Sequence, residues 1–141
     1  MESNQECTFC QIADQKRPAH VVYETSTIMA FFPLSPATKG HTLVVPKSHI
    51  KNFLELDVET GSEISKVVVK VGRALLATLA PQGLNVITSA GEAASQTVMH
   101  LHMHVVPRWE GDAMADFWPT NVRATQSSLK RTAGLVRAYF K

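Results

Sequence analysis

Three histidines alternate with apolar residues in one short stretch of the chain, where Leu101 and Met103 separate His100, His102 and His104. Such period-two alternation is typical of a half-buried β-strand. A strand rises about 3.3 Å per residue, so the three rings would share one face at intervals of roughly 6–7 Å. Neutral imidazole is a nucleophile at neutral pH because its ordinary pKa is about 6.5. The spacing therefore predicts a site that handles one phosphate-sized group.

A polar segment just before these histidines supplies hydrogen-bond donors. Ser95, Gln96 and Thr97 precede the predicted strand, and phosphorus chemistry needs donors aimed at the developing negative charge. The alternative interpretation is an amphipathic strand that exposes histidine to solvent. Six histidines placed at random would give this spacing only about once in a hundred such chains.

Two cysteines, Cys7 and Cys10, are the only ones in the chain. They are too few for a disulfide framework, and in a reducing compartment their spacing indicates metal or redox chemistry. A thioredoxin-like redox pair would need βαβ surroundings, which this sequence lacks.

Composition and charge narrow the class of protein. The 141 residues are 45% hydrophobic, enough for one compact domain. The net charge of +2 comes from 14 basic and 12 acidic residues without a basic block, which argues against extended nucleic acid and allows a small anionic ligand. No signal pattern and no apolar run of about 18 residues occurs, so we expect a soluble, cytoplasmic protein that does not contact a membrane.

The predicted elements must bring these residues together. Short helical structure should carry the cysteines, and a long amphipathic helix within residues 57–80 has apolar residues at spacings of three and four. A last helix is expected over 127–141, with apolar positions at Leu129, Ala133, Val136 and Phe140. The predicted strands cover residues 21–24, 27–32, 41–45, 84–88 and 99–107.

This element order predicts an α+β fold in which helices pack on one side of an antiparallel sheet of about five strands. We expect a single domain with a core over residues 7–107. A flexible N-terminus over 1–6, an irregular segment over 108–126 and the C-terminal helix complete the chain.

The run from His100 to Val106 resembles the signature of the histidine triad (HIT) family of nucleotide hydrolases and transferases, in which three histidines alternate with apolar residues. Other blocks resemble the family in the same order. They are Cys7-Thr8-Phe9-Cys10, Val22-Tyr23-Glu24, Gly40-His41-Thr42-Leu43-Val44-Val45-Pro46-Lys47-Ser48-His49, and Gly91 with Gln96-Thr97-Val98. The resemblance spans roughly residues 7–112 and implies a HIT-like fold.

The resemblance also implies roles for individual residues. His102 matches the nucleophile that takes up a nucleotidyl group, and His104 matches the ring that contacts phosphate and helps the leaving group or water. Gln96 and Thr97 match phosphate-binding residues. Ser89, which stands where Asn or Gln is common, and Ser95, which stands where glycine is usual, are also expected to bind phosphate. Phe32, Leu34 and His41 would line the nucleoside pocket. The alternative is core packing for Phe32 and Leu34, where such residues are more often found, and a strand-end role for His41.

Zinc-containing members of the family, and the related galactose-1-phosphate uridylyltransferases, join two N-terminal cysteines to two histidines. The matching residues here are Cys7, Cys10, His49 and His100. Two thiolates and two imidazoles form a closed tetrahedral set, which is typical of structural zinc. The redox alternative leaves His49 without a role.

One departure from the family pattern concerns the nucleoside. An Asp or Asn usually follows Ala-Phe-x and holds the ribose hydroxyls, but Pro33 occupies that position.

The segment from Pro107 to Asp112 resembles the dinucleoside-polyphosphate hydrolase branch. We therefore expect cleavage of a diadenosine-polyphosphate-like phosphoanhydride, with a nucleoside phosphoramidase or a nucleotide-binding module of weak turnover as alternatives.

Relatives usually form homodimers through the long helix and its neighbouring strand, and the apolar stripe of residues 64–79 is compatible with that.

Overall fold

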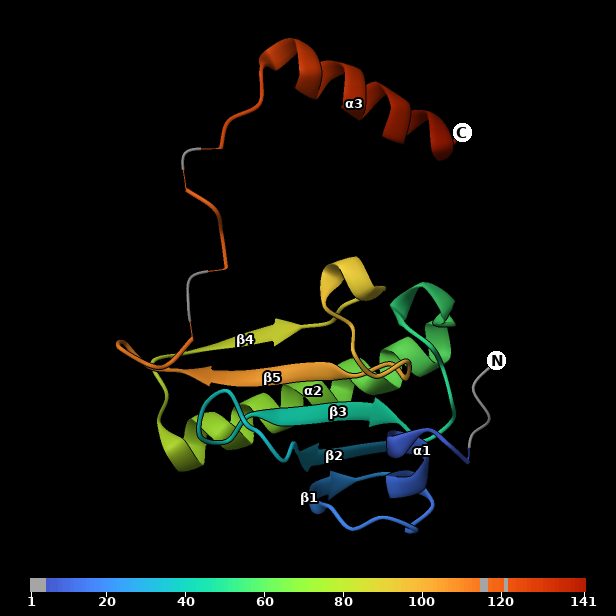
Figure 1. The fold of residues 1–141 in the computed structure, drawn as a ribbon, viewed down its shortest axis with the longest axis vertical. Helices are drawn as coiled ribbons and strands as arrows, with labels where there is room; N and C mark the ends of the chain where they lie inside the picture. The colour runs from blue at the N-terminus through green and yellow to red at the C-terminus, as the bar shows by residue number, and fades with distance from the viewer. Residues whose placement is uncertain (1–4, 115–116, 121) are drawn as a thin grey trace.

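A five-stranded antiparallel sheet forms the centre of the computed structural model, which describes residues 5–114, 117–120 and 122–141. Across the sheet the strand order is β1-β2-β3-β5-β4 (Figure 1). The strands are His20–Glu24 (β1), Ile28–Phe32 (β2), Thr42–Pro46 (β3), Gly83–Ile87 (β4) and Met103–Arg108 (β5). The helices are Thr8–Ala13 (α1), Val58–Leu79 (α2) and Gln126–Tyr139 (α3), with short 3₁₀ turns at Phe53–Glu55 (η1) and Glu92–Ala94 (η2). The predicted α+β class and antiparallel sheet are confirmed.

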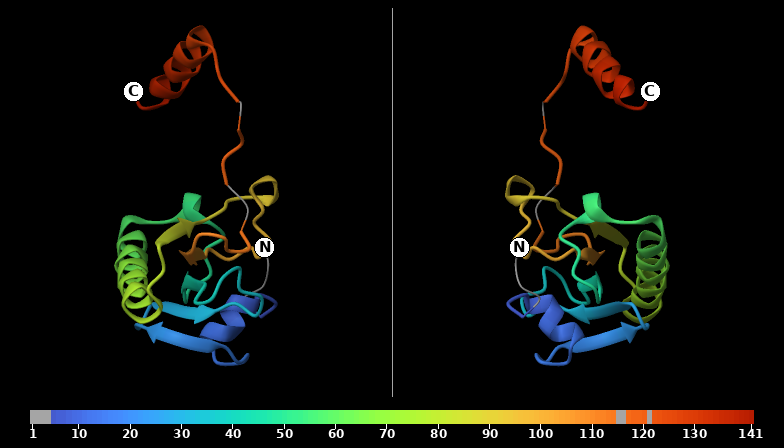
Figure 2. Two further views of the ribbon diagram at one scale, coloured as in Figure 1. Left: turned by 90° about the vertical axis from the view of Figure 1, so that its left-hand side faces the viewer. Right: turned by 90° about the vertical axis from the view of Figure 1, so that its right-hand side faces the viewer.

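Both faces of the sheet are covered (Figure 2). Residues of α2, including Ile64 and Val71, pack against Ile28 and Val44 on one face. On the other face α1 packs against Met29 and its neighbours. The prediction that the helices lie on one side is therefore right for α2 and wrong for α1. Because consecutive residues of β2 and β3 are apolar and buried, each of these strands needs a layer on both faces.

The strand predicted over residues 99–107 begins only at Met103. Before it, the backbone N–H of Leu101 donates to the carbonyl of Ile50 at 2.6 Å, and the ring of His100 is fully buried. The ring centroids of His102 and His104 lie 4.9 Å apart, closer than the spacing expected along one regular strand. The three histidines therefore lie partly on a loop and partly on β5.

The C-terminal end of α2 fixes the loop that leads into β3. Gly40 has φ +85°, and a Cβ at this position would lie 2.5 Å from Cδ1 of Leu79. Glycine both permits this backbone conformation and allows the close approach. The contact holds the residue before His41 against the end of the long helix.

The last helix differs from the others in its packing. The predicted helix over 127–141 is confirmed as α3, but none of its residues is buried, and it stands apart from the sheet (Figure 1). Residues 1–4 of the expected flexible start at 1–6 lie outside the described residues. Residues 115, 116 and 121 of the expected irregular segment 108–126 also lie outside them. Within the described part of the chain, no helix is long and apolar enough to cross a membrane.

Candidate active site and metal centre

Four side chains from separate parts of the chain converge on one point. Cys7 and Cys10 come from α1 and its N-cap, His49 follows β3, and His100 precedes β5. Their ligand atoms all lie within 4.8 Å of one another. The Nδ1 atom of His100 lies 3.3 Å from Sγ of Cys7 and 3.4 Å from Sγ of Cys10, which is itself 3.3 Å from Nδ1 of His49.

The three separations of 3.3–3.4 Å are close to those in a tetrahedral zinc site. With Zn–N of about 2.1 Å and Zn–S of about 2.3 Å, neighbouring ligand atoms in a tetrahedron lie roughly 3.3–3.8 Å apart. The Nε2–H of His100 donates to the carbonyl of Pro46 at 2.7 Å, which leaves Nδ1 unprotonated and directed at the cysteines. A backbone carbonyl holding the second ring nitrogen is the usual orienting contact of a metal-bound histidine. The four residues therefore form a candidate zinc site, as the sequence predicts.

The cluster has structural consequences for the rest of the site. It connects α1 to the segment after β3 and to the segment before β5, which lie 39 and 90 or more residues away in the chain. A set of two thiolates and two imidazoles fills all four positions of a tetrahedral ion, so no position remains open for substrate. A metal bound here would brace the site without taking part in the chemistry.

The tautomer of His102 follows from its backbone contact. Its Nδ1 lies 2.7 Å from the carbonyl oxygen of His100, and a carbonyl can only accept, so Nδ1 carries the proton. The other nitrogen, Nε2, is therefore unprotonated in the neutral ring. The ring packs edge-to-face against Phe9 and against His104, with centroids 5.1 and 4.9 Å away. These contacts hold the unprotonated nitrogen in one orientation.

His104 is oriented by a second histidine. The backbone N–H of Ala37 donates to Nδ1 of His41 at 3.0 Å, so the neutral ring of His41 carries its proton on Nε2. That Nε2 lies 2.8 Å from Nδ1 of His104, which must accept. The proton of His104 is then on Nε2, where it is available to donate to a ligand. His41 is thus a hydrogen-bonding partner of His104 rather than only the end of a strand.

Burial keeps these rings neutral. Desolvation is the main cause that lowers the pKa of His104 to about 4, and the nearby rings of His102 and His41 lower it further. Desolvation also lowers the pKa of His102, against an opposing hydrogen bond to the His100 carbonyl. The pKa of His41 is lowered by burial and then by His102. At neutral pH the cluster therefore presents an unprotonated Nε2 on His102 and an N–H donor on His104.

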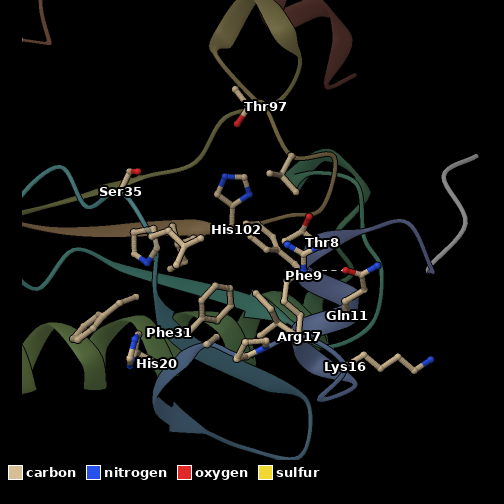
Figure 3. Close-up of a pocket in the computed structure, with 18 of the residues that line it drawn as sticks. Thr8, Phe9, Gln11, Lys16, Arg17, His20, Phe31, Ser35, Thr97 and His102 are labelled. Carbon is tan, nitrogen blue, oxygen red and sulfur yellow. Dashed lines mark hydrogen bonds between the residues drawn. The ribbon is translucent and has the colours of Figure 1, made fainter.

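A cavity of about 1100 Å³ opens in front of His102 and His104. Figure 3 shows His102 between Thr97 on one side and Phe9 and Phe31 on the other. Arg17 and His20 lie at the end of the cavity away from Thr97. Six of the residues that the sequence predicts for the site line this cavity: Phe32, Leu34, His41, Thr97, His102 and His104.

Three other predicted residues, Ser89, Ser95 and Gln96, are not among the described residues that line the cavity. The side chain of Gln96 is buried and fully engaged: Nε2 donates to the carbonyls of Lys51 and Val98, and Oε1 accepts from the N–H of Gly91. A phosphate contact through this amide would break those bonds, so its role here is to brace the loop.

Ser95 lies in the same loop, next to η2. Its φ of +69° is in the left-handed region, a conformation that is strained for a residue other than glycine. Ser89 follows β4 and is half-buried.

The sequence interpretation did not include the wall that α1 contributes. Thr8, Phe9 and Ile12 line the cavity beside His102. The sequence did contain a sign of this wall. A metal ion that joins Cys7 and Cys10 to His100 also brings Phe9 close to His102, which is two residues after His100. The basic residues Lys16 and Arg17 follow on the same segment.

Two variants separate the metal-binding histidine from its neighbour. We expect His100→Ala to lose zinc and about 4 kcal/mol or more of unfolding free energy, because it removes a ligand and leaves the others incomplete. For a chain of this length, this loss lowers Tm by roughly 10 °C or more. His102→Ala should keep its zinc and lose less than about 2 kcal/mol. Elemental analysis and thermal unfolding measure both, and equal loss of zinc in the two variants would contradict the division.

Comparisons with known proteins agree with this geometry. The family model described as HIT domain matches residues 14–111. The protein named "Protein hit" of Bacillus subtilis is 40% identical over 122 residues, which are 86% of this chain and 84% of that relative.

Crystal structures agree as well. One from Streptococcus mutans superposes with a TM-score of 0.92 at 35% identity, covering 99% of this chain and 88% of that chain. Another, of a zinc-bound histidine triad family protein from Mycobacterium smegmatis, has a TM-score of 0.75 at 34% identity and covers 96% of this chain and 99% of that one. The family model covers most of the chain, and the Bacillus subtilis relative is 40% identical over most of both chains. The chain therefore belongs to the HIT family, whose solved structures include one of a histidine triad nucleotide-binding protein.

Proposed function

We propose that this protein cleaves a nucleoside phosphoanhydride, of the diadenosine polyphosphate class, through a covalent nucleotidyl-His102 intermediate. One observation carries the proposal. The hydrogen bond from Nδ1 of His102 to the carbonyl of His100 leaves Nε2 unprotonated beside a large cavity. An unprotonated imidazole nitrogen held in this way is an activated nucleophile.

In the first step, Nε2 of His102 attacks the phosphorus next to the nucleoside. A P–N bond forms, and the P–O bond to the remaining phosphate chain breaks. The imidazole becomes positively charged, and its Nδ1–H donates a stronger hydrogen bond to the His100 carbonyl. In the second step water attacks phosphorus and loses a proton to bulk water, the P–N bond breaks, and a nucleoside monophosphate leaves with His102 neutral again.

Two donors would stabilise the charge that develops on the phosphate oxygens. The Nε2–H of His104 is kept in place by the His41 contact at 2.8 Å. The hydroxyl of Thr97, on the far side of His102 from Phe31 (Figure 3), is a second donor. Removing one such preorganised donor from other active sites costs about 10²–10³ in rate. Thr97 and His104 therefore act as phosphate-binding groups in this proposal, whereas Gln96 and Ser95 shape the loop.

The size and charge of the cavity support an elongated anionic substrate. Its volume of about 1100 Å³ exceeds the range of roughly 300–1,000 Å³ usual for small-ligand sites. Aromatic and aliphatic side chains, including Phe32 and Leu34, line the cavity. Lys16, Arg17 and His20 lie on the side of His102 away from Thr97 (Figure 3). A nucleoside bound against the apolar side chains leaves room for further phosphate or a second nucleoside.

The zinc would serve as a brace in this proposal. The reduced thiols that it needs favour the cytoplasm as the working compartment. We also propose a homodimer, because β4 is an edge strand and carries Val86, an apolar residue that is 56% exposed.

Denaturing mass spectrometry after brief mixing with diadenosine tetraphosphate tests the proposed reaction. We expect the chain to gain the mass of one adenylyl group, and His102→Ala to gain none while remaining folded with zinc. The matched control is His20→Ala, which alters another cavity histidine and should still form the adduct. No adduct on the wild-type chain, with bound ligand detected in parallel, would favour a nucleotide-binding module. Faster adduct formation from an adenosine phosphoramidate would favour P–N bond cleavage.

Substitution of Pro33 tests how the ribose is held. The family pattern places a carboxylate or amide at this position, and Pro33 lines the cavity without an acceptor side chain. We expect Pro33→Asp to tighten adenosine binding by about 10- to 100-fold, because a charge-assisted hydrogen bond contributes about 1.5–3 kcal/mol. Calorimetry with adenosine, which is uncharged, avoids repulsion by the new carboxylate. Pro33→Ala is the control and should give no gain; equal tightening by both variants would show that backbone freedom is responsible.

A further inference from the structure

A second cavity lies on the face of the sheet that α2 covers. Its volume is about 440 Å³, within the range of roughly 300–1,000 Å³ that is usual for small-ligand sites. Strand β1 and the C-terminal half of α2 form its two sides, and its apolar wall includes Val22, Phe32, Val71, Leu75 and Leu79. The catalytic cavity lies on the α1 face instead, and Phe32 is the one described residue that lines both. The second cavity is therefore a separate site.

The cavity exists because α2 does not cover the β1 edge of the sheet. The buried face of α2, with Val71 and Leu75, packs on the middle strands, whereas every residue of β1 is exposed. Lys70, Ala74 and Thr78 recur at intervals of four residues and so share the flank of α2 that lines the cavity. The short side chains of Ala74 and Thr78 leave the space between this flank and β1 open.

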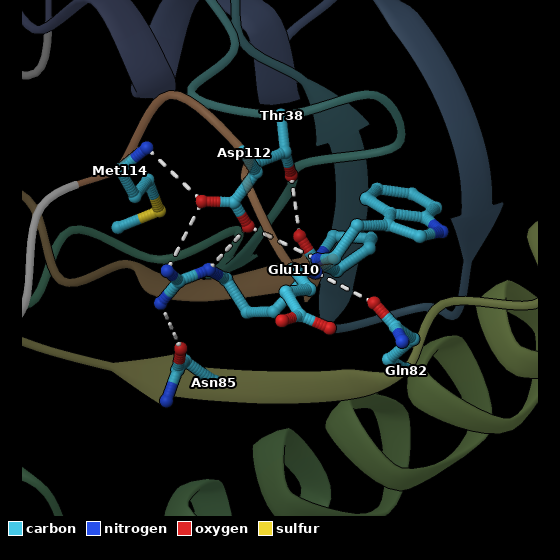
Figure 4. Close-up of polar contacts among 9 residues, drawn as sticks. Thr38, Gln82, Asn85, Glu110, Asp112 and Met114 are labelled. Carbon is cyan, nitrogen blue, oxygen red and sulfur yellow. Dashed lines mark hydrogen bonds and ion pairs between the residues drawn. The ribbon is translucent and has the colours of Figure 1, made fainter.

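Polar contacts beyond the C-terminal end of α2 hold the cavity in shape. Gln82 follows the helix, and its backbone N–H donates to the carbonyl of Arg108 at 2.9 Å. Its side-chain Oε1 accepts from the backbone N–H of Glu110 at 2.6 Å (Figure 4). Before β3, the hydroxyl of Thr38 donates to the carbonyl of Pro107 at 2.7 Å (Figure 4). The last turn of α2 is thus fixed to the end of β5, so the cavity is formed before a ligand binds.

Lys70 connects the two sides of the cavity. Its ammonium donates to the hydroxyl of Tyr23 at 3.2 Å and lies 5.5 Å from the centroid of that ring. An ammonium has three N–H donors and a phenol has one O–H donor, so this contact leaves two N–H groups and the phenol O–H to donate to a ligand. Among the described residues, no carboxylate forms an ion pair with Lys70. The cavity therefore presents a positive charge and up to three donors at one point of its wall.

The remaining wall offers little to a polar ligand. The hydroxyl of Thr42 donates to the carbonyl of Gly40 at 2.8 Å, and the hydroxyl of Thr78 donates to the carbonyl of Ala74 at 2.8 Å. Of the described residues that line the cavity, none is acidic and Lys70 alone is charged. An apolar surface with one cation is complementary to a small molecule that has an aliphatic body and one carboxylate.

We propose that this cavity is a second binding site, for a small aliphatic monocarboxylate whose carboxylate accepts hydrogen bonds from Lys70 and Tyr23. The aliphatic chain of the ligand lies against Val71, Leu75 and Leu79. Strand β1 is at the opposite edge of the sheet from β4, so the homodimer proposed above leaves the site open. The site requires neither that homodimer nor the reaction in the catalytic cavity.

Octanoate and 1-octanol, which have the same chain length and differ in charge, test the site. The methyl groups of Ile, Leu and Val are labelled with ¹³C in the zinc-loaded full-length chain, and methyl spectra are recorded as each probe is added. We expect octanoate to shift the methyl signals of Val71, Leu75 and Leu79, which line the cavity. Shifts confined to Ile12 and Leu43, which line the catalytic cavity, or no shift at all, would overturn the proposal.

Two lysine variants test recognition of the carboxylate. Lys70→Gln should weaken octanoate binding by about tenfold or more, because it removes charge-assisted hydrogen bonds, and should change 1-octanol binding by less than about threefold. Lys66→Gln removes a charge one turn earlier on α2, outside the cavity, and should leave the binding of both probes within about threefold. Equal weakening of octanoate binding by the two variants would overturn recognition by Lys70.

Two alanine variants test the place of binding. Ala74→Phe fills part of the cavity, and we expect it to abolish the methyl shifts caused by both probes. Ala77→Phe makes the same change at an exposed position of α2 that does not line the cavity, and both probes should still bind. Undiminished octanoate binding by Ala74→Phe, or equal loss in the two variants, would contradict the proposed site.

Discussion

The hydrogen bond from Nε2 of His100 to the carbonyl of Pro46 is the contact on which the rest of the site depends. It sets the tautomer of a ring that is fully buried, so that the other nitrogen faces two cysteines and His49. The cluster that results holds α1 against the sheet and fixes the chain just before β5. The carbonyl of this same His100 then accepts the Nδ1–H of His102. One residue therefore connects the metal centre to the chemistry.

This arrangement explains how neighbouring histidines take different roles. The backbone supplies a fixed acceptor to His100 and to His102, but it engages Nε2 in one ring and Nδ1 in the other. His104 is oriented from a third direction, through His41 and the N–H of Ala37. Burial lowers the pKa of each of these rings, so none needs to lose a proton before acting at neutral pH. All three side chains are histidines, and the hydrogen-bond partner of each ring decides its role.

Much of this organisation could be predicted from the sequence, because it depends on residue type and spacing. The apolar periods predicted the sheet and the long helix, whereas the ligand set of two cysteines and two histidines came from the resemblance to the HIT family. The start of β5 at Met103 could not be predicted, since the cluster at His100 holds the preceding residues away from the ladder. The placement of α1 on the second face follows from the burial of β2 on both sides, which a short apolar run does not reveal. The Gln96 amide donates to the carbonyl of Lys51, which lies 45 residues away in the chain. The sequence around Gln96 therefore does not reveal that this side chain braces its own loop.

The protonation of individual ring nitrogens tests the account most directly. In zinc-loaded protein labelled with ¹⁵N at histidine, long-range ¹H–¹⁵N correlation spectra at pH 7.5 distinguish protonated, bare and metal-bound nitrogens. We expect His102 to have a protonated Nδ1 and a bare Nε2, His104 a protonated Nε2, and His100 a protonated Nε2 with a metal-bound Nδ1. A protonated Nε2 on His102 together with a bare Nδ1, or a metal shift on His102 in place of His100, would contradict the division between metal and chemistry.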